Sequence, residues 1–564
     1  MPTLTRNLFA GSGEGDHRLD VVEGHWPDDL DGSVMIVGPD KRAPGGHWFG
    51  EHGLVCRIDC RPDRQGRIGV RARRVHTPLE RLRARWPRLF HRFQFLEVSP
   101  LGVTNLANTN VDTIDGRVFL GYDAGRPVEI DPVTLDHLTP VGSTGEWLQT
   151  VPGLVEPLVS VAAHPAFAHD ERAMYFVNYS MVPGGRTTVA RWGLNGPIER
   201  WPLDGITVEV DSIHDVASTR EHLVVSDLPF VIEPETFAGA ERTRPNQGVT
   251  HLWIVAKSDL RATPPGSPVP CVEVEVPFPT GHLSVGVDEE DGVLTVNLEH
   301  IPLSDLMLPL RADRTSHADG EPFDLGYEGL ITLAVQPGAV GRYRIDAATG
   351  AVLDREVIWD DRFWGPVLST RDLSSPDARA RVRDLWYSGC GYDPGLVSEE
   401  WWRLYGDGGV AHLVHPHDLP AEGRPGTLAH FDLDAGKVDE VWTFAPGALP
   451  TPPTFVPRRD PSGPGDGYVV VLVHLDERKE LQVFDARDLE RGPLAVATGG
   501  GWSPPLLLHS CWVPPRTGPR PSTYRVPLWR DVIGSAQGAP GAIAGILRMA
   551  GAARRAAQEP PANG

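Results

Sequence analysis

The stretch Val-Asp-Thr-Ile-Asp-Gly-Arg-Val-Phe-Leu at residues 111–120 carries the pattern that decides the fold. Asp115-Gly116 separates two short runs of strand-forming residues, and glycine supplies the positive φ that a tight hairpin turn needs. Similar turns recur along the chain, at Asp31-Gly32, Asp291-Gly292, Asp434-Ala435-Gly436 and Asp466-Gly467, and around Asp131, Asp346 and Asp485. The sequence therefore predicts an all-β protein built from consecutive hairpins.

The loose recurrence of these hairpins over some 500 residues favours sheets arranged as blades around an axis, because such blades shelter their edges. We therefore predict a β-propeller with a cap of loops and helices. The predicted domains are an N-terminal extension at 1–20, the propeller at 21–515 and a tail rich in Pro, Gly, Ala and Arg at 516–564.

Composition limits the partners and the compartment. The formal net charge of −22 and the pI near 5.4 argue against a nucleic-acid partner, because an acidic surface repels phosphates. The five cysteines are scattered and odd in number, which indicates a reducing compartment, and Cys56 and Cys60 are interpreted as packing residues on one face of a strand. With no signal-peptide pattern and no long apolar run, we expect a cytoplasmic protein.

Four histidines are the candidate functional residues. His164, His214, His282 and His509 each lie in or beside an apolar run of strand character. A single histidine beside such a strand is more often a hydrogen-bonded core residue than a ligand. Four strands of a propeller could nevertheless direct four imidazoles to one point, and such a set would bind a transition metal.

Two segments depart from the strand pattern. Residues 79–96 mix arginine with Leu, Trp and Phe, which is typical of a segment at a membrane surface. They also fit a connecting helix that packs on the propeller and is broken near Pro87. In the tail, residues 542–550 predict a short amphipathic helix that either contacts a membrane or partner or is simply appended.

Two further clusters have competing interpretations. His412, His415 and His417 could bind zinc, but their Gly- and Pro-rich surroundings favour a solvated loop. Trp401-Trp402 could line a substrate tunnel, although paired tryptophans in a propeller more often pack within blades. The same ambiguity applies to Trp48 and Phe49.

Short motifs in a fixed order give the chain a family resemblance. They are Asp29-Leu30-Asp31-Gly32-Ser33, His47-Trp48-Phe49-Gly50-Glu51-His52-Gly53, Tyr122-Asp123-Ala124-Gly125-Arg126-Pro127, Ala163-His164-Pro165, His214-Asp215, Phe455-Val456-Pro457 and His509-Ser510-Cys511-Trp512. From about residue 20 to about residue 515, the chain resembles the carotenoid cleavage oxygenase family.

This resemblance implies a seven-bladed propeller in which His164, His214, His282 and His509 hold a non-haem Fe(II). In similar enzymes, O₂ cleaves a carbon-carbon double bond of an apolar substrate into two carbonyl products. The substrate would be a carotenoid, an apocarotenoid or a related alkene.

The chain departs from the family where outer glutamates usually accept the second ring N–H of three of the iron-bound histidines. Asp123 stands at the first such place, Trp364 at the second and Pro452 at the third. Loss of such a partner typically costs about 10- to 100-fold in metal affinity or activity unless another group, such as Asp361, replaces it. Two alternatives therefore remain open: a four-histidine enzyme with non-cleaving chemistry, such as an isomerase or hydrolase, and a non-catalytic binding homologue.

Overall fold

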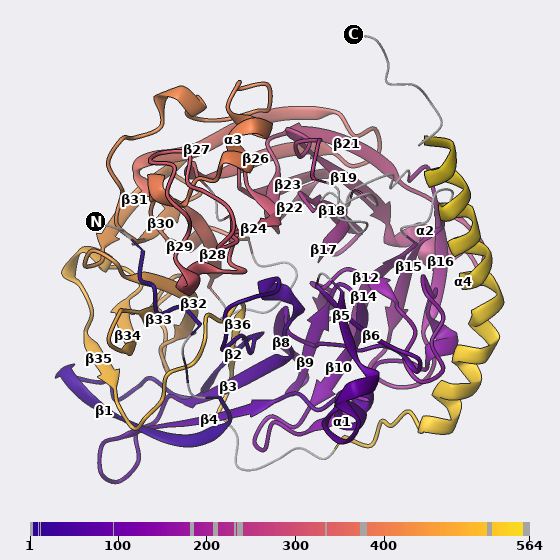
Figure 1. Cartoon of the computed structure of the whole chain (residues 1–564), viewed down its shortest axis with the longest axis horizontal. Coiled ribbons are helices and arrows are strands. Elements are labelled where there is room, and N and C mark those ends of the chain that lie inside the picture. Colours follow the sequence, from indigo (N-terminus) through magenta and orange to yellow (C-terminus); the bar gives the residue numbers. More distant parts are fainter. Residues whose placement is uncertain are drawn as a thin grey trace.

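Antiparallel sheets arranged around a common centre form the body of the molecule (Figure 1). The computed structural model describes residues 4–556 apart from residues 10, 12, 94, 181–184, 207–211, 231–232, 234–240, 333–334, 373–380 and 516–521, and it leaves out the side chains of 284–290 and 549–556. The predicted all-β class is confirmed, because strands dominate and helices are few. The predicted domain boundaries stay predictions.

One nine-stranded sheet joins the two ends of the propeller region. Its order is β32-β33-β34-β35-β1-β4-β3-β2-β36, so β1 pairs with β35 and β2 pairs with β36. These pairings connect residues near the start of the chain to residues near 500, so the two ends of the propeller region share one sheet. The strands are β1 (Gly15–Gly24), β2 (Ser33–Pro39), β3 (Gly53–Asp59), β4 (Ile68–Arg74), β32 (Leu449–Pro457), β33 (Gly467–His474), β34 (Lys479–Asp485), β35 (Ala495–Thr498) and β36 (Ser510–Val513).

In the described part of the chain, five further sheets follow one another in chain order between these ends. The first contains β8 (Asn110–Ile114), β9 (Arg117–Tyr122), β10 (Gly125–Ile130) and β11 (His137–Pro140). The second contains β12 (Ser160–Val161), β13 (Ala166–Ala168), β14 (Ala173–Tyr179), β15 (Thr187–Trp192), β16 (Glu199–Asp204) and β20 (Val269–Pro270). The third contains β17 (Ser212–Ser218), β18 (His222–Leu228), β19 (Val249–Ala256) and β21 (Val272–Pro277).

The fourth of these sheets contains β22 (Thr280–Glu290), β23 (Val293–His300), β26 (Pro337–Asp346) and β27 (Val352–Trp364). The fifth contains β28 (Pro366–Arg371), β29 (Asp384–Gly389), β30 (Thr427–Asp432) and β31 (Lys437–Thr443). Two small sheets consist of β5 (His91–Phe93), β6 (Leu96–Ser99) and β7 (Gly102–Val103), and of β24 (Asp305–Pro309) and β25 (Ile331–Thr332).

The hairpin predicted at Asp115-Gly116 is present between β8 and β9. Ile114 pairs with Arg117, so the turn has two residues, and Asp115 and Gly116 both have positive φ, at 53° and 67°. Both central residues of a type I′ turn need positive φ, which explains the Asp-Gly sequence. Asp291 and Gly292 form a second such turn between β22 and β23.

Apolar side chains fill the spaces between neighbouring sheets. Leu252 of β19 and Leu294 of β23, for example, belong to one buried cluster that joins two consecutive sheets. Cys56 and Cys60 are fully buried in the cluster of the nine-stranded sheet, which confirms them as packing residues. The core therefore lies between blades and leaves the axis to other side chains.

The helices are short, apart from one near the C-terminus. They are α1 (Pro78–Arg85), α2 (Lys257–Ala262), α3 (Glu399–Tyr405) and α4 (Leu528–Ala556), with 3₁₀ turns at Trp48–Gly50, Pro87–Leu89, Thr144–Glu146, Leu325–Tyr327, Pro394–Leu396, Pro416–Asp418 and Leu489–Arg491. In the segment 79–96, α1 ends just before Pro87, as the connecting-helix interpretation expected. The tail helix is longer than predicted and lies along the outside of the body (Figure 1).

The buried pair of Arg126 and Asp531 ties α4 to the propeller. The two guanidinium nitrogens lie 2.9 and 3.1 Å from the carboxylate oxygens, and both side chains are almost fully buried. Among the described residues, none of the helices combines the length and the apolar character that crossing a bilayer requires.

Candidate metal centre

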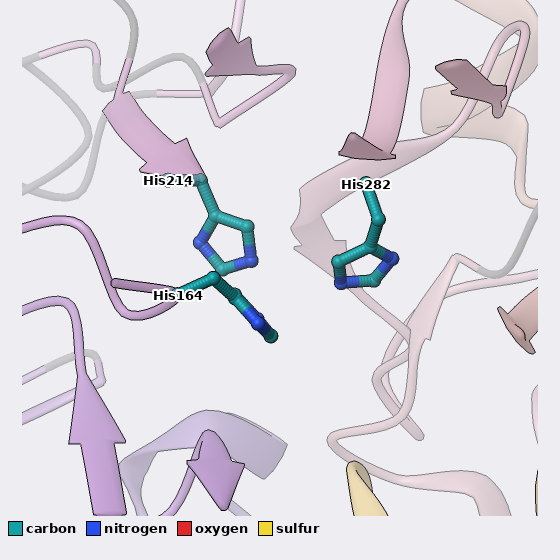
Figure 2. Close-up of side chains that lie close together, drawn as sticks. All are labelled: His164, His214 and His282. Atoms are coloured by element: carbon teal, nitrogen blue, oxygen red, sulfur yellow. The ribbon is translucent and has the colours of Figure 1, made fainter. Parts of the chain in front are cut away.

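The four predicted histidines come from four separate parts of the ring of sheets. His214 is on β17 and His282 is on β22, whereas His164 follows β12 and His509 directly precedes β36. Figure 2 shows the rings of His164, His214 and His282 approaching one another from these separate segments. Residues more than 300 positions apart in the sequence thus meet at the centre of the molecule.

The distances between the rings are short. The ring centroid of His164 lies 4.6 Å from that of His214, 4.9 Å from that of His282 and 4.4 Å from that of His509. His282 and His509 are 4.7 Å apart, and nitrogens of His164, His214 and His282 all lie within 4.8 Å of one another. Two nitrogens bound to one ion at about 2.1 Å can be up to ~4.2 Å apart, so only small movements would let these rings share an ion.

Backbone hydrogen bonds hold His164 and His214 side by side. The N–H of His164 donates to the carbonyl of His214 at 3.0 Å, and the N–H of Val216 donates to the carbonyl of His164 at 2.9 Å. His164 and Asp215 form an isolated parallel bridge. The segment after β12 therefore docks onto β17 through its backbone, which places the two imidazoles independently of any ligand.

Burial favours the neutral form of two of the four rings, His164 and His509. Burial lowers the pKa of His164 well below its usual value, and His509, His214 and His282 lower it further. Burial and neighbouring histidines likewise lower the pKa of His509. The Nε2 atoms of His164 and His282 are buried and have no hydrogen-bond partner among the described residues. Buried imidazoles that are neutral and unpaired are suited to donate a lone pair to a metal ion.

Asp123 contacts the ring of His214. Its Oδ1 accepts a hydrogen bond from His214 Nδ1 at 2.8 Å. Burial alone would lower the pKa of His214, but the charge of Asp123 and this hydrogen bond outweigh burial, so the pKa is raised. The bond also directs Nε2 of His214 toward the other histidines, because Nδ1 carries the shared proton.

Trp364 and Asp361 play no part in this centre. The Trp364 indole donates to the backbone oxygen of Asp361 at 2.8 Å and packs in a separate apolar cluster with Trp401. The Asp361 carboxylate is mostly exposed and lies 3.6 Å from the guanidinium of Arg424. The suggestion that Asp361 replaces the missing glutamate is therefore wrong.

Pro452 lies on β32, within the nine-stranded sheet. Among the described residues, no carboxylate contacts the ring of His509.

Sequence reasoning missed Glu299. Glu299 Oε2 lies 3.6 Å from Nδ1 of His282, and the two residues are direct partners across β22 and β23. The predicted hairpin at Asp291-Gly292 indicates that the strands before and after this turn pair with each other. The sequence does not show the register shift near the turn, which decides that Glu299 lies opposite His282.

An apolar cavity of about 1010 Å³, its mouth included, opens beside the histidines. Its lining includes His214, His282, His509 and Asp123. The remaining lining residues are Trp48, Phe49, Phe95, Thr109, Tyr122, Ala124, Ser212, Leu228, Phe230, Gly281, Ile301, Ser304, Leu306, Ile331, Thr332, Pro366, Val367, Leu368 and Leu508. Such a cavity suits a largely apolar small molecule.

The other predicted clusters lie elsewhere. Trp401 is fully buried on α3 and, like Trp402, is not part of the cavity wall, so the pair packs in a structural cluster around helix α3 rather than in a tunnel or a blade. Among the described residues, His412, His415 and His417 contact one another through their rings but do not bring three ligand atoms together.

Comparison with known proteins defines the class. Residues 9–514 match the family described as retinal pigment epithelial membrane protein. The chain belongs to this family, the carotenoid oxygenases, and its recognition from the sequence is confirmed.

Particular relatives cover nearly the whole chain. The chain is 23% identical to resveratrol cleavage oxygenase 1 of Aspergillus fumigatus, over 89% of this chain and 93% of that protein. It is 21% identical to apocarotenoid-15,15'-oxygenase of Synechocystis, over 88% and 94%.

Solved structures share the fold. The lignostilbene dioxygenase of Pseudomonas brassicacearum aligns with a TM-score of 0.61 at 18% identity, over 90% of this chain and 98% of that chain. A variant of the Synechocystis apocarotenoid oxygenase aligns with a TM-score of 0.60, with the same identity and coverage. The fold is therefore the β-propeller of the carotenoid oxygenases.

Proposed function

We propose that the protein is a non-haem Fe(II) dioxygenase that cleaves a carbon-carbon double bond of an apolar substrate into two carbonyl products. The convergence of His164, His214, His282 and His509 beside an apolar cavity carries this proposal. In the overall reaction, one alkene and one O₂ give two carbonyl compounds, so both oxygen atoms enter the products.

The donor set fits Fe(II). The four imidazoles would hold the ion, and the ion would supply O₂ activation. The chain's residues hold the imidazoles, exclude water and present the double bond. The cavity offers mainly apolar contacts for this purpose, and the proposed reaction needs no proton donor or base from the protein.

The substrate class is supported by the cavity and by the relatives. Trp48, Phe49, Phe95 and Phe230 form part of the lining, and the Phe95 and Phe230 rings meet edge to face with centroids 5.1 Å apart. Aromatic walls of this kind bind flat conjugated molecules. The names of the relatives specify resveratrol, lignostilbene and apocarotenoids. We propose a carotenoid, an apocarotenoid or a related conjugated alkene as the substrate.

The propeller would have seven blades. The nine-stranded sheet contains two groups of blade size, β32–β35 and β1–β4 with β36, and five further sheets lie between them.

A cytoplasmic location remains part of the proposal.

Metal binding is the first test. The purified protein is analysed for iron and titrated anaerobically with Fe(II), beside His214→Ala and His509→Ala variants. We expect near-stoichiometric iron in the wild type and loss of binding in both variants. A wild type that contains no iron and does not bind Fe(II) would contradict the proposal and favour a non-catalytic binding homologue.

Oxygen consumption then separates cleavage from other chemistry. We expect O₂ uptake with conjugated alkenes and, with ¹⁸O₂, label in both carbonyl products. Isomerised or hydrolysed products without O₂ uptake would favour the isomerase or hydrolase alternative instead.

A peripheral membrane contact through residues 79–96 completes the proposal. Trp86, Leu89 and Phe93 are exposed large apolar side chains in this segment, and nearby Phe95 lines the cavity. A membrane-facing mouth would let a lipid-soluble substrate enter from the bilayer.

A further inference from the structure

We propose that Glu299 is the positioning residue of His282, held in place by Ser369. This inference rests on the proposed metal site. It assigns to a neighbouring strand the outer carboxylate that Trp364 cannot provide.

The sheet places Glu299 opposite His282. The two residues are direct partners in the antiparallel pairing of β22 with β23. Side chains of directly opposite residues lie on the same face of a sheet, with Cβ atoms about 5 Å apart. Glu299 Oε2 accordingly lies 3.6 Å from His282 Nδ1, and both side chains are largely shielded from solvent. A shift of a few tenths of an ångström would make this contact a hydrogen bond.

Ser369 orients the carboxylate. Its hydroxyl donates to Glu299 Oε1 at 2.5 Å from β28, the first strand of the next sheet. The other oxygen, Oε2, is buried and has no hydrogen-bond partner among the described residues. An unpaired buried carboxylate oxygen is costly, so an N–H donor is expected beside it. His282 Nδ1 is such a donor.

Nε2 of His282 is the ring nitrogen that remains available to the proposed metal ion. This nitrogen is buried and unpaired among the described residues, and His282 belongs to the group whose ligand atoms lie close together. If Nδ1 donates its proton to Glu299, the lone pair of Nε2 faces the centre and the ring cannot rotate freely. A carboxylate partner also makes the imidazole a stronger ligand.

The other acids near His282 have different partners. Asp215 accepts a hydrogen bond from the backbone N–H of Leu283 at 3.0 Å, and Asp123 binds His214. Asp361 is not near His282, because its carboxylate is mostly exposed and lies beside Arg424. Glu299 differs from them in having a buried, unpaired oxygen 3.6 Å from Nδ1 of His282. Ser369 lies on the strand that follows Trp364, so the segment without the expected glutamate still contributes to the contact.

Anaerobic titration with Co(II), followed by its visible absorption bands, tests the inference. The variants are Glu299→Gln and Ser369→Ala, and Glu275→Gln on the exposed edge of β21 is the control. We expect Glu299→Gln to weaken Co(II) binding about 10- to 100-fold and to shift the bands. Ser369→Ala should weaken binding about threefold, because the carboxylate remains but is less ordered. The control should match the wild type.

The outcomes distinguish the two proposals. Wild-type affinity and spectrum in Glu299→Gln, while His282→Ala abolishes binding, would overturn the role of Glu299 and leave the metal site standing. A wild type that binds neither Co(II) nor Fe(II) would overturn both. If circular dichroism shows that Glu299→Gln is misfolded, Ser369→Ala decides: unchanged affinity in that variant overturns the inference.

Discussion

Asp123 Oδ1 lies 2.8 Å from Nδ1 of His214, a residue 91 positions later in the chain. An aspartate is one methylene shorter than the glutamate usual in this family, yet it reaches the ring. The contact is possible because Asp123 follows the end of β9 directly, at the cavity wall that His214 also lines.

Asp123→Asn should weaken Fe(II) binding about 10- to 100-fold, because the amide cannot supply the charge that orients and strengthens the His214 imidazole. The measurement is an anaerobic Fe(II) titration. Asp28→Asn, whose side chain is almost fully exposed, serves as the control and should bind iron normally. Equal affinities in the two variants would contradict this role.

His300→Gln should change how stability depends on pH. Burial lowers the pKa of His300 to about 3, and its ring contacts the hydroxyl of Tyr343 at 2.8 Å. The unfolded chain takes up a proton near pH 6.5, whereas the folded protein does not, so this histidine reduces stability as the pH falls below 6.5.

The glutamine in the variant takes up no proton when the chain unfolds. The free energy of unfolding of the variant should therefore rise by about 2 kcal/mol relative to that of the wild type between pH 7 and pH 5, at about 1.4 kcal/mol per pH unit below pH 6.5. Urea unfolding at both pH values measures it. The variant must be compared with the wild type at each pH, because both proteins contain Glu156. Burial raises the pKa of Glu156 to about 7, so this group increases stability as the pH falls. Parallel pH profiles would refute the prediction.

Phe230→Ala should lower kcat/KM about tenfold without loss of iron, because it removes one ring of the Phe95–Phe230 pair from the cavity wall. Steady-state kinetics with a conjugated alkene, beside iron analysis, checks this. Trp359→Ala on the exposed side of β27 is the control. Loss of iron together with activity would instead indicate damage to the fold.

Asp531→Ala should release α4 from the propeller. It leaves the buried Arg126 guanidinium without its carboxylate partner, a change that costs about 3–5 kcal/mol in comparable pairs. Limited proteolysis should then cut near Leu528 faster than in the wild type. Arg530→Ala, at a half-exposed neighbour, should not accelerate cleavage.

The combined variant Trp86→Ser, Leu89→Ser and Phe93→Ser should reduce co-sedimentation with vesicles of phosphatidylcholine and anionic phosphatidylglycerol. These side chains are 48%, 43% and 42% exposed, whereas Phe90 is buried and is left unchanged. Removing three apolar groups from a membrane-facing surface weakens its partitioning. Unaltered binding would argue against contact through this segment.

The sequence by itself predicted the hairpins, the all-β class, the family and the four histidines. These features depend on local chemistry: Asp115-Gly116 can form a tight turn wherever it occurs, and short motifs around His164 and His509 keep their order along the chain. Local turn chemistry and alternating apolar residues are properties of neighbouring residues, so the sequence shows them directly.

Only the tertiary structure decided which acids meet which histidines. Near the turn, Glu290 pairs with Val293, and counting back from there would place Ile301 opposite His282. A register shift between Gly286 and Glu290 places Glu299 there instead. Such a shift depends on how the whole sheet twists and packs against its neighbours, which no short stretch of sequence encodes. Tertiary packing likewise places Trp364 in an apolar cluster with Trp401 and Asp361 beside Arg424, away from the histidines.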